Sequence, residues 1–342
     1  MKMTTQNLMI QLLLALVPGI IAMTWFLGLG ILINLFVAVM VALIAEYMML
    51  SLRLRSTANM DKGAAIKSQL SDCSAIVTAA LVAICLPPYL SIWLVATGIL
   101  FAIIFGKHIY GGLGHNIFNP AMVGFAILIV SFPLAMSQWP VLGGPGPSTA
   151  DLLQVKLGLM SVPDGITAAT PLDIIKFRGS QTIDEVWLAK NGFNSFSGIG
   201  WGWINAGFLL GGLYLLKNRI IQYHAPASLL LTLTVLSIFF YDSGSSESYG
   251  SPLLHLFSSS TMFAAFFIVT DPVSSPSGKG GQIVFGVGVG IITFIIRTTG
   301  AYPEGIAFGI LLMNAAAPLI DRLRLAPPKL DTLSGGDRRE QS

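Results

Sequence analysis

The chain has 342 residues, of which 54% are hydrophobic and only 10% are charged. Soluble domains carry about 25% charged residues, so this composition excludes an ordinary soluble globular protein and predicts a membrane protein. The formal net charge of +3 is too small to indicate a surface that binds nucleic acid. The two cysteines, Cys73 and Cys85, form neither a disulfide framework nor a metal-binding pattern, and no metal site is predicted.

Long stretches of the sequence lack charge altogether. Residues 3–45, 73–106 and 108–150 contain no Asp, Glu, Lys or Arg. A helix that crosses a bilayer needs about 20 apolar residues, and helices are expected because backbone polar groups in lipid must bond within their own segment. We therefore predict an all-α polytopic membrane protein with about ten transmembrane helices. In chain order they are expected at about 7–26, 29–50, 72–87, 89–106, 118–136, 198–216, 222–241, 252–269, 280–297 and 304–320.

The first apolar stretch, residues 8–23, follows Lys2 in the way that the apolar part of a signal peptide would. However, no clear small-residue cleavage site follows it, and a second apolar run starts at once. We interpret this stretch as a retained first helix.

The distribution of Lys and Arg predicts the orientation of these helices. Positively charged residues favour cytoplasmic segments, and a cytoplasmic N-terminus leaves the short external turns near residues 28, 88 and 245 without any. We expect a multi-pass protein of the bacterial inner membrane, with both termini cytoplasmic and one long periplasmic loop, 137–197. The basic residues then left outside the cytoplasmic segments are Lys156, Lys176, Arg178, Lys190 and Arg297.

Short internal similarities divide the chain into two halves. The segment 71–74 runs into Thr78-Ala79-Ala80, as the segment 258–261 runs into Ala264-Ala265. Five helices per half would invert the second repeat relative to the first, a plan common in transporters; chance resemblance between apolar segments is the alternative. The expected domains are a first five-helix repeat (1–136), the periplasmic loop (137–197), a second five-helix repeat (198–321) and a cytoplasmic tail (322–342).

The predicted loop contains the segment that points to chemistry, Asp164-Gly-Ile-Thr167-Ala168-Ala169-Thr170-Pro171. It resembles the recognition site of the periplasmic flavin transferases, which attach flavin mononucleotide (FMN) to the hydroxyl of the last Thr through a phosphoester. A hydroxyl acts as a nucleophile when a base and a metal are supplied, here both expected from the transferase. Pro171 disfavours helical geometry at Thr170. The alternative is that Asp164 and Thr167 form an ordinary turn or helix cap.

The sequence is similar along almost its whole length to the D subunits of Rnf complexes. The matching stretches include 16–25, 111–121, 270–276, 302–305 and 314–321. The related B subunit of the sodium-pumping NADH:quinone reductase usually has a longer N-terminal extension, which favours the Rnf family. One departure is Ala168, where a Gly is common before Ala-Thr.

The resemblance implies a role and a set of partners. Rnf complexes move electrons between ferredoxin and NAD and couple this flow to sodium or proton translocation, and a D subunit supplies one covalent flavin. It implies covalent FMN on Thr170, with Asp164, Thr167 and Ala169 as recognition positions for a periplasmic flavin transferase. The expected partners are the other Rnf subunits and the lipid bilayer, and not nucleic acid. Whether a second, noncovalent flavin is bound stays open.

Other polar residues are weaker candidates. Asn116 and Asn119, next to Pro120, either line an interrupted helix that binds flavin or an ion, or merely break and cap it. Asp271 is either a functional group or a cap, and Glu46 and Asp72 are expected to face the membrane interface. The segment Gly286-Val-Gly288-Val-Gly290 lacks the strand-to-helix setting of a dinucleotide site and is expected to allow close helix packing.

No catalytic residue is predicted, so the chain is expected to be a component of an oxidoreductase rather than an enzyme by itself. A rival hypothesis is a solute channel or transporter with urea-transporter-like architecture, which also uses inverted five-helix repeats. The segment 164–170 discriminates between them, because a simple channel has no use for a flavin attachment site.

Overall fold

The computed structural model of the chain describes residues 4–54, 62–142, 146–163, 165–189, 197–198 and 200–324. It consists of helices, with one sheet of two short strands between two helical groups. The N-terminal group contains α1 (Thr5–Leu27), α2 (Gly30–Arg53), α3 (Lys62–Leu70), α4 (Ser74–Ile84), α5 (Ile92–Phe101), the π-helix η2 (Ala102–His108) and α6 (Pro120–Ser131).

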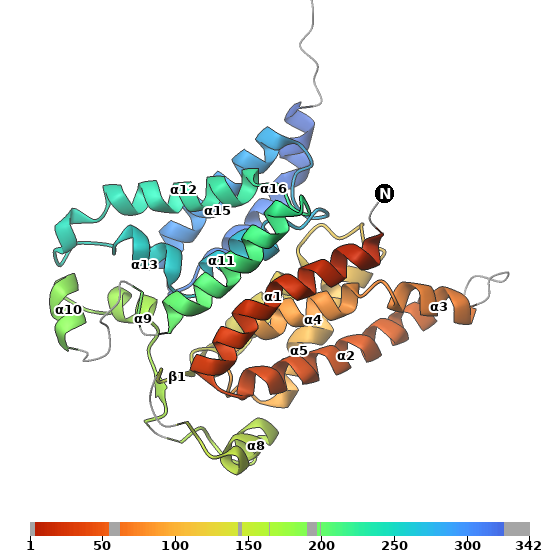
Figure 1. The fold of residues 1–342 in the computed structure, drawn as a ribbon, viewed down its shortest axis with the longest axis horizontal. Coiled ribbons are helices and arrows are strands. Elements are labelled where there is room, and N and C mark those ends of the chain that lie inside the picture. The colour runs from red at the N-terminus through yellow and green to blue at the C-terminus, as the bar shows by residue number, and fades with distance from the viewer. Residues whose placement is uncertain are drawn as a thin grey trace, which may run out of the picture.

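The connecting segment contains the sheet and several short helices. It comprises α7 (Pro133–Met136), β1 (Trp139–Pro140), α8 (Thr149–Leu157), β2 (Thr167–Ala168), α9 (Pro171–Lys176) and α10 (Ile183–Ala189). Figure 1 shows α8, β1, α9 and α10 on one side of the molecule, beyond the ends of the longer helices.

The C-terminal group completes the fold. It contains α11 (Trp201–Lys217), α12 (His224–Phe239), the 3-10 turn η3 (Asp242–Gly244), α13 (Pro252–Phe257), α14 (Thr261–Phe263), the π-helix η4 (Ala264–Ile268), α15 (Lys279–Thr299) and α16 (Ile306–Arg324). The two groups meet where α1 packs along α11 and α6 packs on α16, and Figure 1 shows α11 beside α1.

Four of the described helices, α1, α2, α15 and α16, are long and apolar enough to cross a membrane. Several predicted crossings are shorter than expected. The crossing predicted at 72–87 is wrong in length, because α4 has 11 residues, or about 16 Å at 1.5 Å per residue, against a hydrocarbon layer of about 30 Å. The crossing predicted at 118–136 is divided into α6 and α7 by Pro133.

The predicted crossing at 252–269 is likewise interrupted. Helix α13 ends at Phe257, and α14 begins only at Thr261. Between them Ser259 has a φ of 55°, a left-handed conformation that does not continue an α-helix. The side-chain amide of Asn205 on α11 donates to the carbonyls of Phe257 and Ser259 at 2.8 and 2.9 Å. This interruption is therefore held in place by hydrogen bonds from a neighbouring helix.

Close helix packing explains the glycine-rich segment of α15, as expected from the sequence. A Cβ atom on Gly286 would lie 2.1 Å from Ser228 Oγ, and one on Gly290 would lie 2.8 Å from Thr232 Cβ. Both neighbours are on α12. Small residues here let the backbones of α12 and α15 approach each other.

The prediction that Glu46 faces the membrane interface is wrong. Glu46, on α2, is 3% exposed, and its Oε1 accepts a hydrogen bond of 2.7 Å from Lys107 Nζ. His108 Nε2 lies 3.1 Å from the other carboxylate oxygen, and Lys107 also donates to Ser74 Oγ at 2.8 Å. A buried carboxylate needs such partners to offset its desolvation. Asp72 remains partly exposed and accepts from the backbone N–H of Ser74 at 2.7 Å.

The connecting segment is fastened to the N-terminal group through a buried lysine. Lys156 on α8 is fully buried, and its Nζ donates to Asn34 Oδ1 and, at 3.0 Å, to the carbonyl of Leu90. Burial lowers the pKa of Lys156 to about 7. This contact places α8 at the same end of the molecule as the start of α2 and the 85–91 turn. We call this end of the molecule the loop end.

Candidate functional site

The candidate attachment segment lies at the loop end, in the connection between β2 and α9. Thr167 and Ala168 form β2 and pair antiparallel with β1, in the register Trp139 to Ala168 and Pro140 to Thr167. Ala169 follows as an exposed residue. Asp164, predicted to belong to the recognition motif, lies outside the described residues. The structure therefore places Thr167, Ala169 and Thr170 in one continuous extended segment.

Thr170 is held in an extended conformation immediately before α9. Its φ and ψ are −69° and 163°, and Pro171 is the first helical residue. A proline at this position has its φ set for the helix and disfavours helical geometry in the preceding residue. The extended geometry expected from Pro171 is therefore confirmed.

A capping box connects Thr170 to Asp173, the third residue of α9. The backbone N–H of Asp173 donates to Thr170 Oγ1 at 3.3 Å, and the backbone N–H of Thr170 donates to Asp173 Oδ2 at 2.9 Å. The Thr170 hydroxyl also donates to Asp173 Oδ2, at 2.6 Å. Sequence reasoning did not single out Asp173, although a Thr followed three residues later by an acidic residue is a known capping signature.

Helix α9 is fixed to the C-terminal group through Lys176. Its Nζ donates to the carbonyls of Ile296 and Tyr302 at 2.9 and 2.7 Å. Partial burial lowers the pKa of Lys176, and the nearby carboxylate of Asp173 acts in the opposite direction. The ammonium group thereby ties Thr170 and its helix to the connection between α15 and α16.

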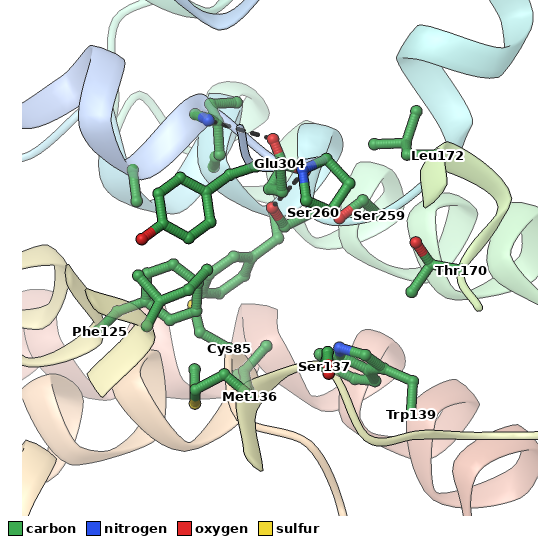
Figure 2. A pocket seen from close by; sticks show the side chains of 18 of the residues that line it. Cys85, Phe125, Met136, Ser137, Trp139, Thr170, Leu172, Ser259, Ser260 and Glu304 are labelled. Carbon is green, nitrogen blue, oxygen red and sulfur yellow. Dashed lines mark hydrogen bonds between the residues drawn. The ribbon is translucent and has the colours of Figure 1, made fainter. Parts of the chain in front are cut away.

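A mostly apolar cavity opens beside Thr170, and Figure 2 shows Thr170 and Leu172 on one side of it. The empty space within it is about 1120 Å³, including the part open to solvent. Both helical groups contribute to its walls, which makes it a cavity between the two halves of the chain. The lining side chains include Met23, Cys85, Phe125, Met136, Trp139, Trp201, Phe208, Phe263, Tyr302 and Glu304.

Aromatic side chains give this cavity flat faces. Trp139 and Trp201 meet edge to face with their ring centroids 5.5 Å apart, and Phe208 and Phe263 do so at 5.1 Å. Such faces suit a planar aromatic ligand, and the Thr170 side chain is among those that line the cavity.

A buried ion pair lies beside the cavity, where its carboxylate, Glu304, is one of the lining residues. Arg297 on α15 donates to both carboxylate oxygens of Glu304 at 2.9 Å, to Thr261 Oγ1 at 2.8 Å and to the carbonyl of His255 at 2.9 Å. Glu304 in turn accepts from Ser260 Oγ at 3.3 Å, and Figure 2 shows both residues beside the cavity. Glu304 thereby adds a carboxylate to a mostly apolar cavity wall.

Asn119 lies in a different polar cluster, away from this cavity. Asn119 caps α6: its Oδ1 accepts from the backbone N–H groups of Ala121 and Met122 at 3.0 and 3.2 Å. Its amide donates to Asp271 Oδ2 at 3.2 Å, and its backbone N–H donates to Asn314 Oδ1 at 3.0 Å. The helix-capping alternative therefore accounts for Asn119.

Asn116 and Asp271 have similar local roles. The amide of Asn116 donates to the carbonyl of Phe118 at 3.1 Å. Asp271 accepts from the backbone N–H of Val273 at 3.2 Å and from Ser274 Oγ at 2.7 Å. Neither asparagine lines the cavity at Thr170. Across the part of the chain that is described, no cluster of three or more His, Cys, Asp or Glu side chains could hold a metal ion.

The long apolar helices and the buried polar contacts between helices are those of a multi-pass α-helical membrane protein. The chain belongs to the NQR2, RnfD, RnfE family, whose sequence profile matches residues 1–327.

Curated relatives are similar over nearly the same span. The chain is 48% identical to a protein of Ectopseudomonas mendocina over 93% of this chain and 89% of that one. It is 43% identical to one of Cellvibrio japonicus (93% and 88%) and 41% identical to one of Vibrio cholerae (94% and 93%). Each of these relatives is named as the D subunit of an ion-translocating oxidoreductase complex.

Proposed function

We propose that this chain is a redox subunit that carries FMN on Thr170 and relays electrons within an ion-translocating oxidoreductase complex. The observation that carries the proposal is the placement of Thr170, which lies in an extended, partly exposed segment and lines the apolar cavity. The names of the relatives support membership of such a complex. The attachment motif favours this function over a solute channel.

In this proposal each part of the site has a distinct task. Thr170 holds the phosphate, and the cavity between the halves receives the isoalloxazine ring. Bound flavin supplies one-electron chemistry, while the protein supplies position and tuning. Trp139, Trp201 and Phe208 would exclude water from the ring, and Glu304 would supply a carboxylate in the cavity wall. Covalent attachment prevents loss of the cofactor from the outer side of the membrane.

Two buried polar clusters support an inverted repeat within a plan of ten crossings. In the N-terminal half, Lys107 donates to Ser74, the first residue of α4, and to Glu46. In the C-terminal half, Arg297 donates to Thr261, the first residue of α14, and to Glu304. Each short helix follows a residue with positive φ, Cys73 or Ser259. Helix α14 begins beside the cavity at the loop end, whereas α4 ends there, at Cys85. The two short helices therefore run in opposite directions relative to the loop end, as an inverted repeat requires.

The orientation proposed from the Lys and Arg distribution puts the loop end in the periplasm. A cysteine placed at Ser148, which is exposed, should react with a membrane-impermeant thiol reagent in intact cells after Cys73 and Cys85 have been replaced. A cysteine placed at Gly335 should react only after the membrane has been permeabilised. The reverse pattern of labelling would show that the orientation is wrong.

The proposed role as an electron relay also predicts that the isolated chain reacts with neither NADH nor reduced ferredoxin. Its two cysteines are too few to ligate an iron–sulfur cluster, and the proposed flavin lies across a hydrocarbon layer about 30 Å thick from the cytoplasm. Other subunits must bring electrons to it. Stopped-flow absorbance should show no rapid flavin bleaching in the purified chain but rapid bleaching in the whole complex. Rapid bleaching of the isolated chain would point to a donor site within it.

A further inference from the structure

The hydroxyl group of Thr170 has a proton acceptor in contact with it before any other protein arrives. Its oxygen accepts from the backbone N–H of Asp173 at 3.3 Å, and its proton points to Asp173 Oδ2 at 2.6 Å. A hydroxyl oxygen has two lone pairs, so one of them remains free. That is the arrangement of an activated nucleophile beside its base.

We propose that Asp173 is the general base for attachment of flavin to Thr170, an inference that rests on the proposed function of Thr170 as the attachment site. The co-reactant is a flavin adenine dinucleotide. Thr170 Oγ1 attacks the phosphorus of the FMN half, forming the phosphoester bond. The phosphoanhydride bond breaks, AMP leaves with the bonding electron pair, and the hydroxyl proton passes to the Asp173 carboxylate. Nothing is oxidised or reduced.

The position of Asp173 suits a reaction with a second protein. Thr170 is partly exposed, Ala168 and Ala169 before it are exposed, and Gly165 carries no side chain. A transferase can therefore approach Thr170 along the 165–169 side of the segment, while Asp173 contacts the hydroxyl from α9. The chain then supplies the base, and the transferase supplies the dinucleotide, the metal and their orientation. This differs from the expectation that the transferase brings the base.

The same loop contains a matched control for the helix-capping role. Ser148 precedes α8 as Thr170 precedes α9, its hydroxyl donates to Asp151 Oδ2 at 2.7 Å, and the backbone N–H of Asp151 donates back at 3.2 Å. This pair has nearly the same geometry but lies outside the attachment motif. Asp151→Asn therefore removes a carboxylate from the same local contact without touching Thr170.

The experiment measures the rate of flavin incorporation into the full-length chain in membranes, with purified transferase and flavin adenine dinucleotide. General base catalysis contributes about 10²–10⁴-fold to a rate, so Asp173→Asn should slow incorporation by at least about 100-fold. The Asn side chain can still accept from the Thr170 N–H but cannot take the proton. Asp173→Glu keeps a carboxylate and should restore at least a tenth of the wild-type rate, whereas Asp151→Asn should leave the rate unchanged.

Rescue by Asp173→Glu, which keeps the carboxylate, separates a base from a merely structural residue. Equal slowing by Asp173→Asn and Asp151→Asn, or a wild-type rate for Asp173→Asn, would overturn the proposal. If Asp173→Asn does not fold, as judged by its melting temperature, Asp173→Glu is the deciding variant. A folded Asp173→Glu chain that fails to incorporate flavin would overturn the role of Asp173 as the base. Absence of flavin from the wild-type chain would instead refute the attachment site itself.

Discussion

Replacing Thr170 by alanine is expected to abolish the flavin fluorescence of the denatured chain. The wild-type chain should fluoresce in a denaturing gel and exceed the mass of its polypeptide by one FMN phosphoester. Alanine offers no oxygen for the phosphoester, so both signals should disappear while the protein stays in the membrane. The loss of the cap on α9 should cost only about 1 kcal/mol of stability, and the Lys176 contacts to Ile296 and Tyr302 still fix that helix.

Two variants serve as controls for the loss of the cap and of the hydroxyl. Thr182 precedes α10 in the same loop, and its Oγ1 accepts from the backbone N–H of Glu185 at 3.2 Å. Thr182→Ala should therefore remove a comparable cap and leave the fluorescence intact. Thr170→Ser keeps a hydroxyl and should keep the flavin. Fluorescence that survives denaturation in Thr170→Ala would place the attachment at another residue.

Replacing Lys107 by methionine should destabilise the helical core more than any surface substitution. Lys107 and Glu46 have side chains that are 3% and 4% exposed, and removal of the lysine leaves a buried carboxylate with only His108 beside it. Breaking such a pair costs about 3–5 kcal/mol. Thermal unfolding of the purified protein in detergent, followed by tryptophan fluorescence, should show a clearly lower midpoint.

A second substitution tests the cause of this loss. In Lys107→Met/Glu46→Gln no charge of the pair remains, and the midpoint should return most of the way to that of the wild type. Lys217→Met, at the exposed end of α11, should change the stability by less than about 0.5 kcal/mol. A double variant as unstable as the single one would mean that packing, and not the unpaired carboxylate, causes the loss.

Local chemistry could be inferred from the sequence because it acts over a few residues. The charge-free runs predicted apolar helices, Pro171 predicted the extended conformation of Thr170, and Gly286 and Gly290 predicted close packing. The lengths of the middle helices were not predictable in the same way. An apolar run looks the same whether it forms one helix or is interrupted, as at Ser259, where Asn205 from another helix stabilises the break.

By itself, the sequence determined the membrane class, the family and the hydroxyl that is proposed to carry flavin. Only the tertiary structure decided which distant groups meet. Glu46 pairs with Lys107 across 61 positions, and Asn119 reaches Asp271 across 152. The cavity beside Thr170 is built from both halves of the chain. The physical reason is that such contacts depend on how each helix is rotated and offset against its neighbours, and these relations are fixed by packing among all helices together rather than by any local pattern.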